Sequence, residues 1–153
     1  MKTSIRTATT QDLHQIIELG KELYLIEKRF EPHLIFSELE ARSRYEFELK
    51  NSDALVLVAE FDDRIVGYLY AHNDAVDYLD VLQKECEIEV IFVEPEYRGQ
   101  GIASQLIEKG LVWAKSKNVF RVKSGILVGN HCSDALFAKF KFKPYHTTYT
   151  FDS

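Results

Sequence analysis

The order of the patterns along this sequence predicts a mixed α/β fold, in which helices cover both faces of one central sheet. Three observations support the prediction. Short β-branched and aromatic runs, such as residues 54–61 and 65–72, are typical of buried strands. Stretches with apolar residues at helical spacing separate these runs. A glycine-containing turn after residue 93 joins a strand to an amphipathic helix, as is common in α/β folds.

The expected elements follow the order β-α-α-β-β-β-α-β-α-β. Strands are predicted at residues 4–8, 54–61, 65–72, 88–93, 120–128 and 142–151. Helices are predicted from Thr9 or Thr10 to about residue 28, from Ser37 to about residue 50, from residue 102 past residue 114, and at residues 133–140. The first two helices begin at recognisable caps, since threonine is a good N-cap residue and Ser37 with Glu40 forms a capping box. Residues 73–85 are expected to be an irregular or short helical insert.

Length and composition fit one globular domain over residues 1–153, because 153 residues with 46% hydrophobic content can bury a sizeable core. The N-terminus has no apolar signal core, and the longest apolar run, 54–59, is far shorter than the ~20 residues that a membrane span needs. We therefore expect a cytoplasmic protein that does not enter a membrane. Cys86 and Cys132 lack metal-site spacing and are expected to be free thiols. Exposed edge strands leave room for a homodimer.

Charge is distributed unevenly along the chain. The formal net charge is −5, but residues 1–97 contain 10 Lys/Arg and 21 Asp/Glu, whereas residues 98–153 contain nine Lys/Arg and three Asp/Glu. The two balances are −11 and +6, which sum to −5. We expect a basic surface that suits a polyanion and an acidic surface that suits a cation. Nucleic acid is not favoured as a partner, because the basic residues are scattered along the sequence.

The turn between residues 93 and 106 has the features of an anion-binding site. It lies at the N-terminus of a predicted helix, where four backbone amides lack intrahelical partners and the helix dipole places partial positive charge. Gly99 and Gly101 would let an anion approach the backbone closely. The turn is neither a P-loop nor a dinucleotide fingerprint, since Ser104 stands in place of the third glycine. A pyrophosphate suits this geometry; a helix-capping turn that binds nothing is the alternative.

The residues of this turn resemble the acetyl-CoA signature of the GNAT superfamily of acyl-CoA-dependent N-acyltransferases. Arg98-x-x-Gly101-x-Ala103, preceded by Val93-x-Pro95, follows the pattern Q/R-x-x-G-x-G/A, and the resemblance covers essentially all 153 residues. It implies one N-acetyltransferase domain with a GNAT-like sheet, whose two middle strands splay apart, and acetyl-CoA as cosubstrate with pantetheine in that gap. The residues implied in cofactor binding are Ile91, Phe92, Val93, Arg98, Gly99, Gln100, Gly101, Ile102, Ala103, Ser104, Asn130 and Phe137.

Glu87 and Glu89 are the candidates for a catalytic base. They lie two apart in the strand before the turn and are expected to face the same side as Ile91 and Val93. A carboxylate in so apolar a strand is expected to have a raised pKa. In the family that the chain resembles, a glutamate at the start of this strand removes the amine proton, and the distance from Val93 favours Glu87. The other interpretation is that each carboxylate reaches solvent or pairs with a Lys or Arg.

Residues 130–142 are similar to the family's later motif, N-x-x-A-x-x-x-Y-x-x-x-G-F, with two departures. Phe137 stands where many members have the tyrosine that protonates the departing thiolate, and Lys141 replaces the glycine. Phenylalanine cannot donate a proton, so solvent or another residue such as Tyr145 would do so; a thiol pKa near 8.5 makes solvent feasible. Asn130 either contacts CoA or caps the helix.

Together these features predict an enzyme that moves an acetyl group from acetyl-CoA directly to a primary amine, with neither a covalent enzyme intermediate nor a metal. The acidic N-terminal half favours a small cationic acceptor, such as a polyamine or an aminoglycoside-like amine. A protein N-terminus or lysine is the nearest alternative. A CoA-binding sensor module without catalysis is a third hypothesis, because the tyrosine is missing at Phe137.

Overall fold

A computed structural model of the chain describes residues 3–73 and 84–153. The expected insert at residues 73–85 lies almost entirely outside the described residues. The strands are β1 Ser4–Thr7, β2 Ala54–Phe61, β3 Arg64–His72, β4 Glu85–Val93 and β5 Arg121–Lys123. The helices are α1 Leu13–Glu27, α2 Glu38–Glu48, α3 Ile102–Ser116 and α4 His131–Lys139, with short 3-10 turns η1 Thr10–Asp12 and η2 Pro95–Tyr97.

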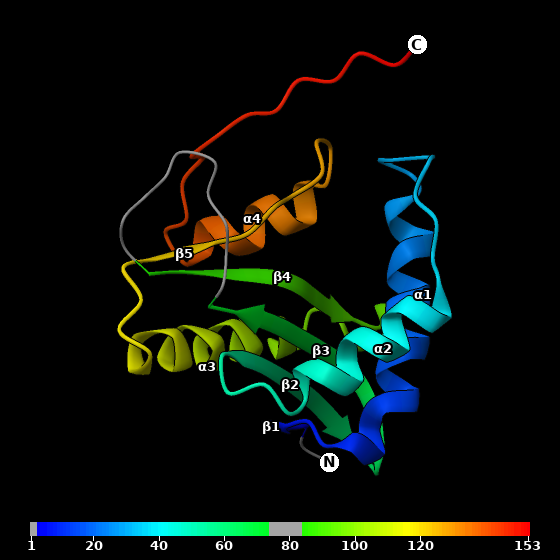
Figure 1. The fold of residues 1–153 in the computed structure, drawn as a ribbon, viewed down its shortest axis with the longest axis vertical. Coiled ribbons are helices and arrows are strands. Elements are labelled where there is room, and N and C mark those ends of the chain that lie inside the picture. The colour runs from blue at the N-terminus through cyan, green and yellow to red at the C-terminus, as the bar shows by residue number, and fades with distance from the viewer. Residues whose placement is uncertain (1–2, 74–83) are drawn as a thin grey trace.

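The strands form one sheet in the order β1-β2-β3-β4-β5. Each neighbouring pair is antiparallel except β4 and β5, which run parallel (Figure 1). Antiparallel neighbours can be joined by a short turn, and β2 and β3 are joined at Asp62 and Asp63. Both aspartates have positive φ, which Asp tolerates better than most residues. The predicted hairpin is therefore confirmed.

Helices cover both faces of the sheet. On one face, Ile16 and Ile17 of α1 and Tyr45 of α2 pack against residues of β2 and β3 such as Val58. On the other face, α3 residues such as Leu106 pack against the sheet together with Phe137 of α4. The predicted fold class, a mixed α/β sheet between helices, is confirmed.

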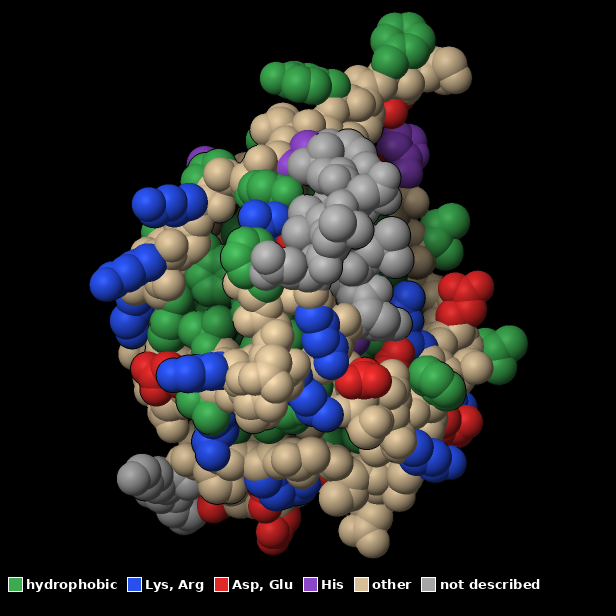
Figure 2. All heavy atoms as spheres, turned by 60° about the vertical axis from the view of Figure 1, so that its left-hand side comes forward, with side chains coloured by type: hydrophobic (Ala, Val, Ile, Leu, Met, Phe, Trp, Pro, Cys, Tyr) green, Lys and Arg blue, Asp and Glu red, His purple; other side chains and the backbone are tan. Residues whose placement is uncertain are grey.

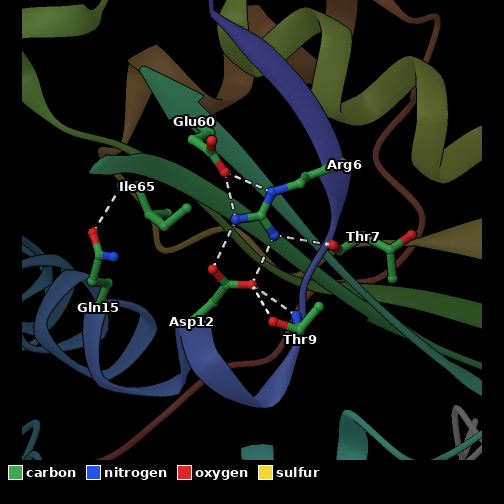
Figure 3. Close-up of polar contacts among 7 residues, drawn as sticks. All are labelled: Arg6, Thr7, Thr9, Asp12, Gln15, Glu60 and Ile65. Atoms are coloured by element: carbon green, nitrogen blue, oxygen red, sulfur yellow. Dashed lines mark hydrogen bonds and ion pairs between the residues drawn. The ribbon is translucent and has the colours of Figure 1, made fainter. Parts of the chain in front are cut away.

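A partly buried ion-pair network fixes β1 to the start of α1. The Arg6 guanidinium donates to both carboxylate oxygens of Asp12 at 2.8 Å and to Glu60 of β2 at 2.6 Å (Figure 3). Asp12 also accepts from the backbone amide of Thr9 at 2.7 Å. The bond from Arg6 lowers the Asp12 pKa from its usual 3.8 to about 2, although burial opposes the shift. The network joins β1, β2 and the turn that leads into α1.

Two expectations at the C-terminal end were wrong. The predicted strand at residues 142–151 is not formed: this stretch has no regular secondary structure, and Tyr149 and Phe151 are 91% and 93% exposed. The predicted strand at residues 120–128 is paired only over β5. Strand propensity mainly reflects how a side chain fits a half-buried sheet surface. Without a neighbouring strand and a covering layer, β-prone residues here do not form one.

Candidate active site

The site begins where β4 and β5 separate. Their parallel pairing ends at Glu87 and Lys123, although β4 continues to Val93. Just beyond this point the Ser124 hydroxyl donates to the Ile88 carbonyl at 2.8 Å. Residues 89–93 of β4 therefore have no β5 partner, and one backbone edge of β4 lines the gap between the strands. The pairing thus ends where the resemblance to the family implies a splay between two middle strands.

The turn after β4 has the conformation expected of an anion cradle. Gly99 and Gly101 have φ values of 75° and 78°, in the left-handed region that favours glycine, and Gly101 is the N-cap of α3. A Cβ at either position would meet nothing within 4 Å, so conformation and not crowding requires glycine here. Within the described chain, no acceptor is found for the backbone amides of residues 99–104. These amides and the α3 dipole can receive a phosphate.

Two cationic side chains lie at the cradle, and only one was predicted. Arg98 folds back, with Nε donating to the Val93 carbonyl at 2.9 Å and the guanidinium carbon 5.8 Å from the Phe92 ring centroid. Lys139 was missed; its Nζ donates to the Ser104 hydroxyl at 2.9 Å, in the first turn of α3. The contact joins residues 35 positions apart. Nothing local in the sequence indicates that the end of α4 lies beside the start of α3.

A β-bulge changes which face of the sheet the candidate glutamates occupy. Tyr70 of β3 pairs with Val90, but the next β3 residue pairs with Ile88, so Glu89 has no partner on β3. Ile88 and Ile91 both pack on the α3 side, whereas Glu89 and Val90 line the α1–α2 side. Alternation places Glu87 on that side too. The expectation that the glutamates share a face with Ile91 and Val93 was therefore wrong.

The environment of Glu89 is polar and cationic. Its carboxylate pairs with the Arg44 guanidinium of α2 and lies 3.2 Å from Nε2 of His72 at the end of β3. The bond from His72 and the charge of Arg44 lower the Glu89 pKa below the usual 4.5, against the effect of burial. The expected rise in pKa was wrong for Glu89, because the apolar strand sequence does not reveal these two partners.

A cavity of about 260 Å³ opens between α1, α2 and the sheet beside the bulge. Glu89 lines it and Glu87 does not. The walls of the cavity combine aromatic rings with charged groups. The aromatic residues are Tyr24, Phe36, Tyr45 and Tyr68, and the charged residues are Glu27, Glu40, Arg44 and Glu89. The rings pack edge to face, with centroids 5.1 Å apart for Tyr24 and Phe36 and 6.1 Å apart for Tyr45 and Tyr68. Such a chamber can hold an organic cation between rings and carboxylates.

Among the described residues, neither Glu27 nor Glu40 of this cavity has an ion-pair partner, and Glu27 is the more buried of the two. It lies in the last turn of α1, is half-buried, and has no ion-pair partner within the described residues. Burial raises its pKa above the usual 4.5, because the charged form loses solvation. A cationic ligand bound beside Glu27 would compensate for the lost solvation of its charged form. For this residue the sequence offers only a general signal, the acidity of the N-terminal half.

The remaining candidates lie around α4 and β5. Asn130 caps α4, accepting from the Ser133 amide at 3.2 Å, as the capping alternative predicted. Phe137 is 4% exposed and packs on Phe142, so it belongs to the core. The ring centroid of Tyr145 lies 4.4 Å from the guanidinium carbon of Arg121, and Arg121 itself pairs with Glu85. The structure thus places Tyr145 beside the first residues of β4, away from the cradle at its other end.

Neither a metal centre nor a membrane span emerges from residues 3–73 and 84–153. No group of three or more His, Cys, Asp or Glu side chains there could hold a metal ion. No helix in the same ranges is long and apolar enough to cross a bilayer. The site consists of an amide cradle, a gap between two strands, and an acidic aromatic cavity on the opposite face.

An α/β domain with a glycine cradle beside splayed strands defines a class of CoA-dependent transferases, and comparison with known proteins agrees. Residues 19–142 match the family described as the Acetyltransferase (GNAT) family, and the chain belongs to that family. It is an acetyl-CoA-dependent N-acetyltransferase.

Two relatives and one solved structure illustrate the similarity. An uncharacterized N-acetyltransferase of Archaeoglobus fulgidus is 29% identical over 74% of this chain and 75% of its own. A Bacillus subtilis protein named "Putative [ribosomal protein bS18]-alanine N-acetyltransferase" is 29% identical over 67% of this chain and 62% of its own. The structure of AAC(6')-Iy with the bisubstrate analog CoA-S-monomethyl-acetylneamine aligns over 100% of this chain and 99% of its own, with a TM-score of 0.79 and 21% identity. At 21% identity, the similarity to the AAC(6')-Iy structure shows a shared fold.

Proposed function

We propose that this enzyme acetylates the primary amine of a small cationic molecule that enters the cavity between α1 and α2. The observation that carries the proposal is Glu27, a half-buried carboxylate without a counter-ion among the described residues, facing a chamber of aromatic rings. An ammonium group there would offset the cost of burying Glu27 and lie against ring faces. A second amine of the same molecule would then be presented towards Glu89 and the gap at β4. A cytoplasmic location stays a prediction.

The charges of the cavity favour a cation over other acceptors. Three carboxylates, Glu27, Glu40 and Glu89, share the walls with one arginine, Arg44. A neutral amine would leave Glu27 uncompensated, and an acidic acceptor would be repelled by it. The complex of AAC(6')-Iy with an acetylneamine-based bisubstrate analog supports the class of acceptor, because that protein shares this fold.

For the cosubstrate, we propose that the amides of residues 99–104, with the side chains of Arg98 and Lys139 beside them, hold the CoA pyrophosphate, and that pantetheine follows the backbone of Ile91 to Val93 in the gap. The acceptor nitrogen attacks the thioester carbonyl carbon, the C–S bond breaks, and CoA leaves as a thiolate. Phe137 has no ionisable group and Tyr145 lies beside Arg121. Solvent therefore protonates the thiolate, whose thiol has a pKa of about 8.5.

Glu89 is the better candidate for the base, because it lines the cavity and Glu87 does not. Its pKa lies below 4.5, so taking a proton from a free ammonium with a pKa of about 10 would be strongly uphill. The acceptor therefore reacts as its neutral amine, and Glu89 takes the proton that the nitrogen loses as the C–N bond forms, when the nitrogen becomes more acidic. His72, 3.2 Å from Glu89, holds the carboxylate in place.

The test measures thiol release from acetyl-CoA with diamines, polyamines, aminoglycosides, neutral amines and peptides. We expect the di- and polycationic acceptors to be preferred. Glu27→Gln should lower kcat/KM for them by roughly 10-fold to 100-fold, the loss of one charge-assisted hydrogen bond, without changing KM for acetyl-CoA. The matched control is Glu18→Gln, which removes an exposed α1 carboxylate outside the cavity.

Two results would replace the proposal. A preference for peptides, unaffected by Glu27→Gln, would favour protein acetylation, the activity in the name of the Bacillus subtilis relative. Tight acetyl-CoA binding without turnover on every acceptor class would favour the CoA-binding sensor, which the missing tyrosine at Phe137 allows.

A further inference from the structure

Two buried tyrosine hydroxyls in the wall of the cavity are poorly satisfied by hydrogen bonds. Tyr45 of α2 and Tyr68 of β3 both line the cavity, although the two residues are only 5% and 1% exposed. Their hydroxyl oxygens lie 3.5 Å apart, farther than the roughly 2.8 Å of a strong O–H···O bond. Neither hydroxyl has another hydrogen-bond partner within residues 3–73 and 84–153. Two hydroxyls carry two hydrogens and their mutual bond uses one, so the other hydrogen has no acceptor in those ranges.

The protein keeps room beside these hydroxyls and keeps them protonated. Gly20 of α1 also lines the cavity, and a Cβ at this position would lie 3.2 Å from the Tyr68 hydroxyl oxygen. Glycine inside a helix is less favourable than alanine, so room for this hydroxyl is a physical reason for Gly20. Burial raises the pKa of Tyr45 to about 12 and the pKa of Tyr68 well above its usual 10. The pair therefore has a hydrogen to donate at any physiological pH.

The hydroxyl pair lies between the two carboxylates that would receive the acceptor. Besides burial, the charge of Glu27 raises the pKa of Tyr68, and the charge of Glu89 raises the pKa of Tyr45. A diamine that reaches from Glu27 to Glu89 therefore passes the hydroxyls with the atoms between its two nitrogens. Methylene groups there would enclose the free hydroxyl hydrogen without an acceptor, whereas a ligand hydroxyl would accept it.

Charge alone does not distinguish one cationic amine from another. Figure 2 shows Lys and Arg side chains spread over the face of the molecule that is turned away from α1, whereas the cavity walls hold three carboxylates and one arginine. Cationic amines in general are therefore attracted to the cavity. Two diamines of equal charge gain equally from this attraction. Selection between them requires a neutral group that recognises one of them.

We propose that Tyr45 and Tyr68 select diamines that carry a hydroxyl group between the two nitrogens, an inference that rests on the proposed function. The ligand hydroxyl lies between the two tyrosines, accepts a hydrogen bond from one and donates to the other. Without it, a tyrosine hydrogen stays buried and unbonded, so a diamine that lacks the hydroxyl should react with a kcat/KM roughly 5-fold to 100-fold lower. The two tyrosines thus determine specificity without touching the reacting atoms.

The test measures thiol release from acetyl-CoA by the full chain with pairs of diamines of equal charge. Diaminopropane is compared with diaminopropanol, and putrescine with diaminobutanediol. A hydroxyl also lowers the basicity of neighbouring amines in every variant, so the quantity compared is the change in preference between parent and variant.

The parent should prefer the hydroxylated member of each pair, and Tyr45→Phe/Tyr68→Phe should lose the preference. In that double variant, kcat/KM for diaminopropane and KM for acetyl-CoA should change by less than about twofold, because both hydroxyls are removed together and both rings remain. Each single variant should lose part of the preference. The control is Tyr149→Phe, which removes the hydroxyl of a 91% exposed tyrosine outside the cavity and should keep the parental preference.

Two kinds of result distinguish this proposal from the function on which it rests. If diamines are turned over in a manner that depends on Glu27, a parent without the preference, or a folded double variant that keeps it, would overturn the role of the tyrosines alone. If no diamine is turned over, or if Glu27→Gln changes nothing, the proposed function fails and the selection fails with it. Urea unfolding checks the fold of each variant, and the single variants give the same comparison if the double variant is unfolded.

Discussion

Substituting Gly101 by valine tests whether the turn before α3 is a phosphate cradle. Gly101 has a φ of 78°, and nothing lies within 4 Å of the position of a Cβ. A left-handed conformation costs a residue with a Cβ about 1–2 kcal/mol, and a β-branched residue is a still rarer occupant of that region. Because no neighbour crowds this position, the unliganded turn of the Gly101→Val variant has room to relax to a right-handed conformation. Binding then has to restore the strained one.

The strain should therefore weaken acetyl-CoA binding and should hardly change the free energy of unfolding. At about 1.4 kcal/mol per factor of ten, 1–2 kcal/mol corresponds to roughly 5-fold to 30-fold weaker acetyl-CoA binding, and the branched side chain beside the anion adds to it. Calorimetric titration with acetyl-CoA measures the affinity, and urea unfolding checks the fold. Asn118→Ala is the matched control, since Asn118 has a φ of 56° at the opposite end of α3.

The control should change acetyl-CoA affinity by less than about twofold, because Asn118 follows the C-terminal end of the helix, where the dipole does not favour anions. A folded Gly101→Val variant that binds acetyl-CoA as tightly as the parent would refute the cradle. Equal losses in both variants would refute it as well, because strain anywhere near α3 would then explain the effect.

Three further predictions concern ion pairs and charges. Asp12→Asn should lower the unfolding free energy at pH 7 by about 2 kcal/mol, because the Asp12 pKa is about 2 in the folded protein and 3.8 ordinarily. Since the folded pKa is depressed, this stability is lost as the pH falls, and the unfolding free energies of parent and variant, measured in urea, should converge between pH 4 and pH 2. Lys139→Ala should raise KM for acetyl-CoA roughly 2-fold to 10-fold, whereas the control Lys143→Ala should leave KM unchanged. Equal effects of the two substitutions would show that Lys139 has no specific role in binding acetyl-CoA. Glu89→Gln should lower kcat by about 100-fold or more, and Glu87→Gln should lower it by less. In the pH profile of the parent's kcat, the acidic limb should lie below pH 4.5, and a limb near neutral pH would point to a different base.

Local signals in the sequence predicted the helices and the hairpin well. Ser37 and Glu40 mark the start of α2, where the Ser37 hydroxyl accepts from the Glu40 amide at 3.3 Å. The hairpin of β2 and β3 follows two mainly apolar runs separated by a short charged turn, and Gly99 and Gly101 have the left-handed conformation that favours glycine. Each of these features depends on residues close together in sequence, and each element's type follows from its own side chains.

Several side chains of the site could not be predicted, because their positions depend on contacts between distant segments. His72 and Arg44 reach Glu89 from β3 and α2, and Lys139 reaches Ser104 from α4. The sequence contains all of these residues, but no spacing relates them. The same limit explains residues 142–151: their strand propensity is evident, yet in the described part of the chain no strand pairs with them.

The bulge at Glu89 is the most consequential of these non-local features. With regular alternation, Glu89 would share a face with Ile91 and Val93 and would point towards α3, on the same side as the cradle. One extra residue instead places Glu89 in the cavity of α1 and α2, while Ile91 and Val93 keep to the α3 side. Donor and acceptor can then approach the gap between β4 and β5 from opposite faces of the sheet. A direct transfer between two bound substrates needs that arrangement, because the amine must reach a thioester that already occupies the gap.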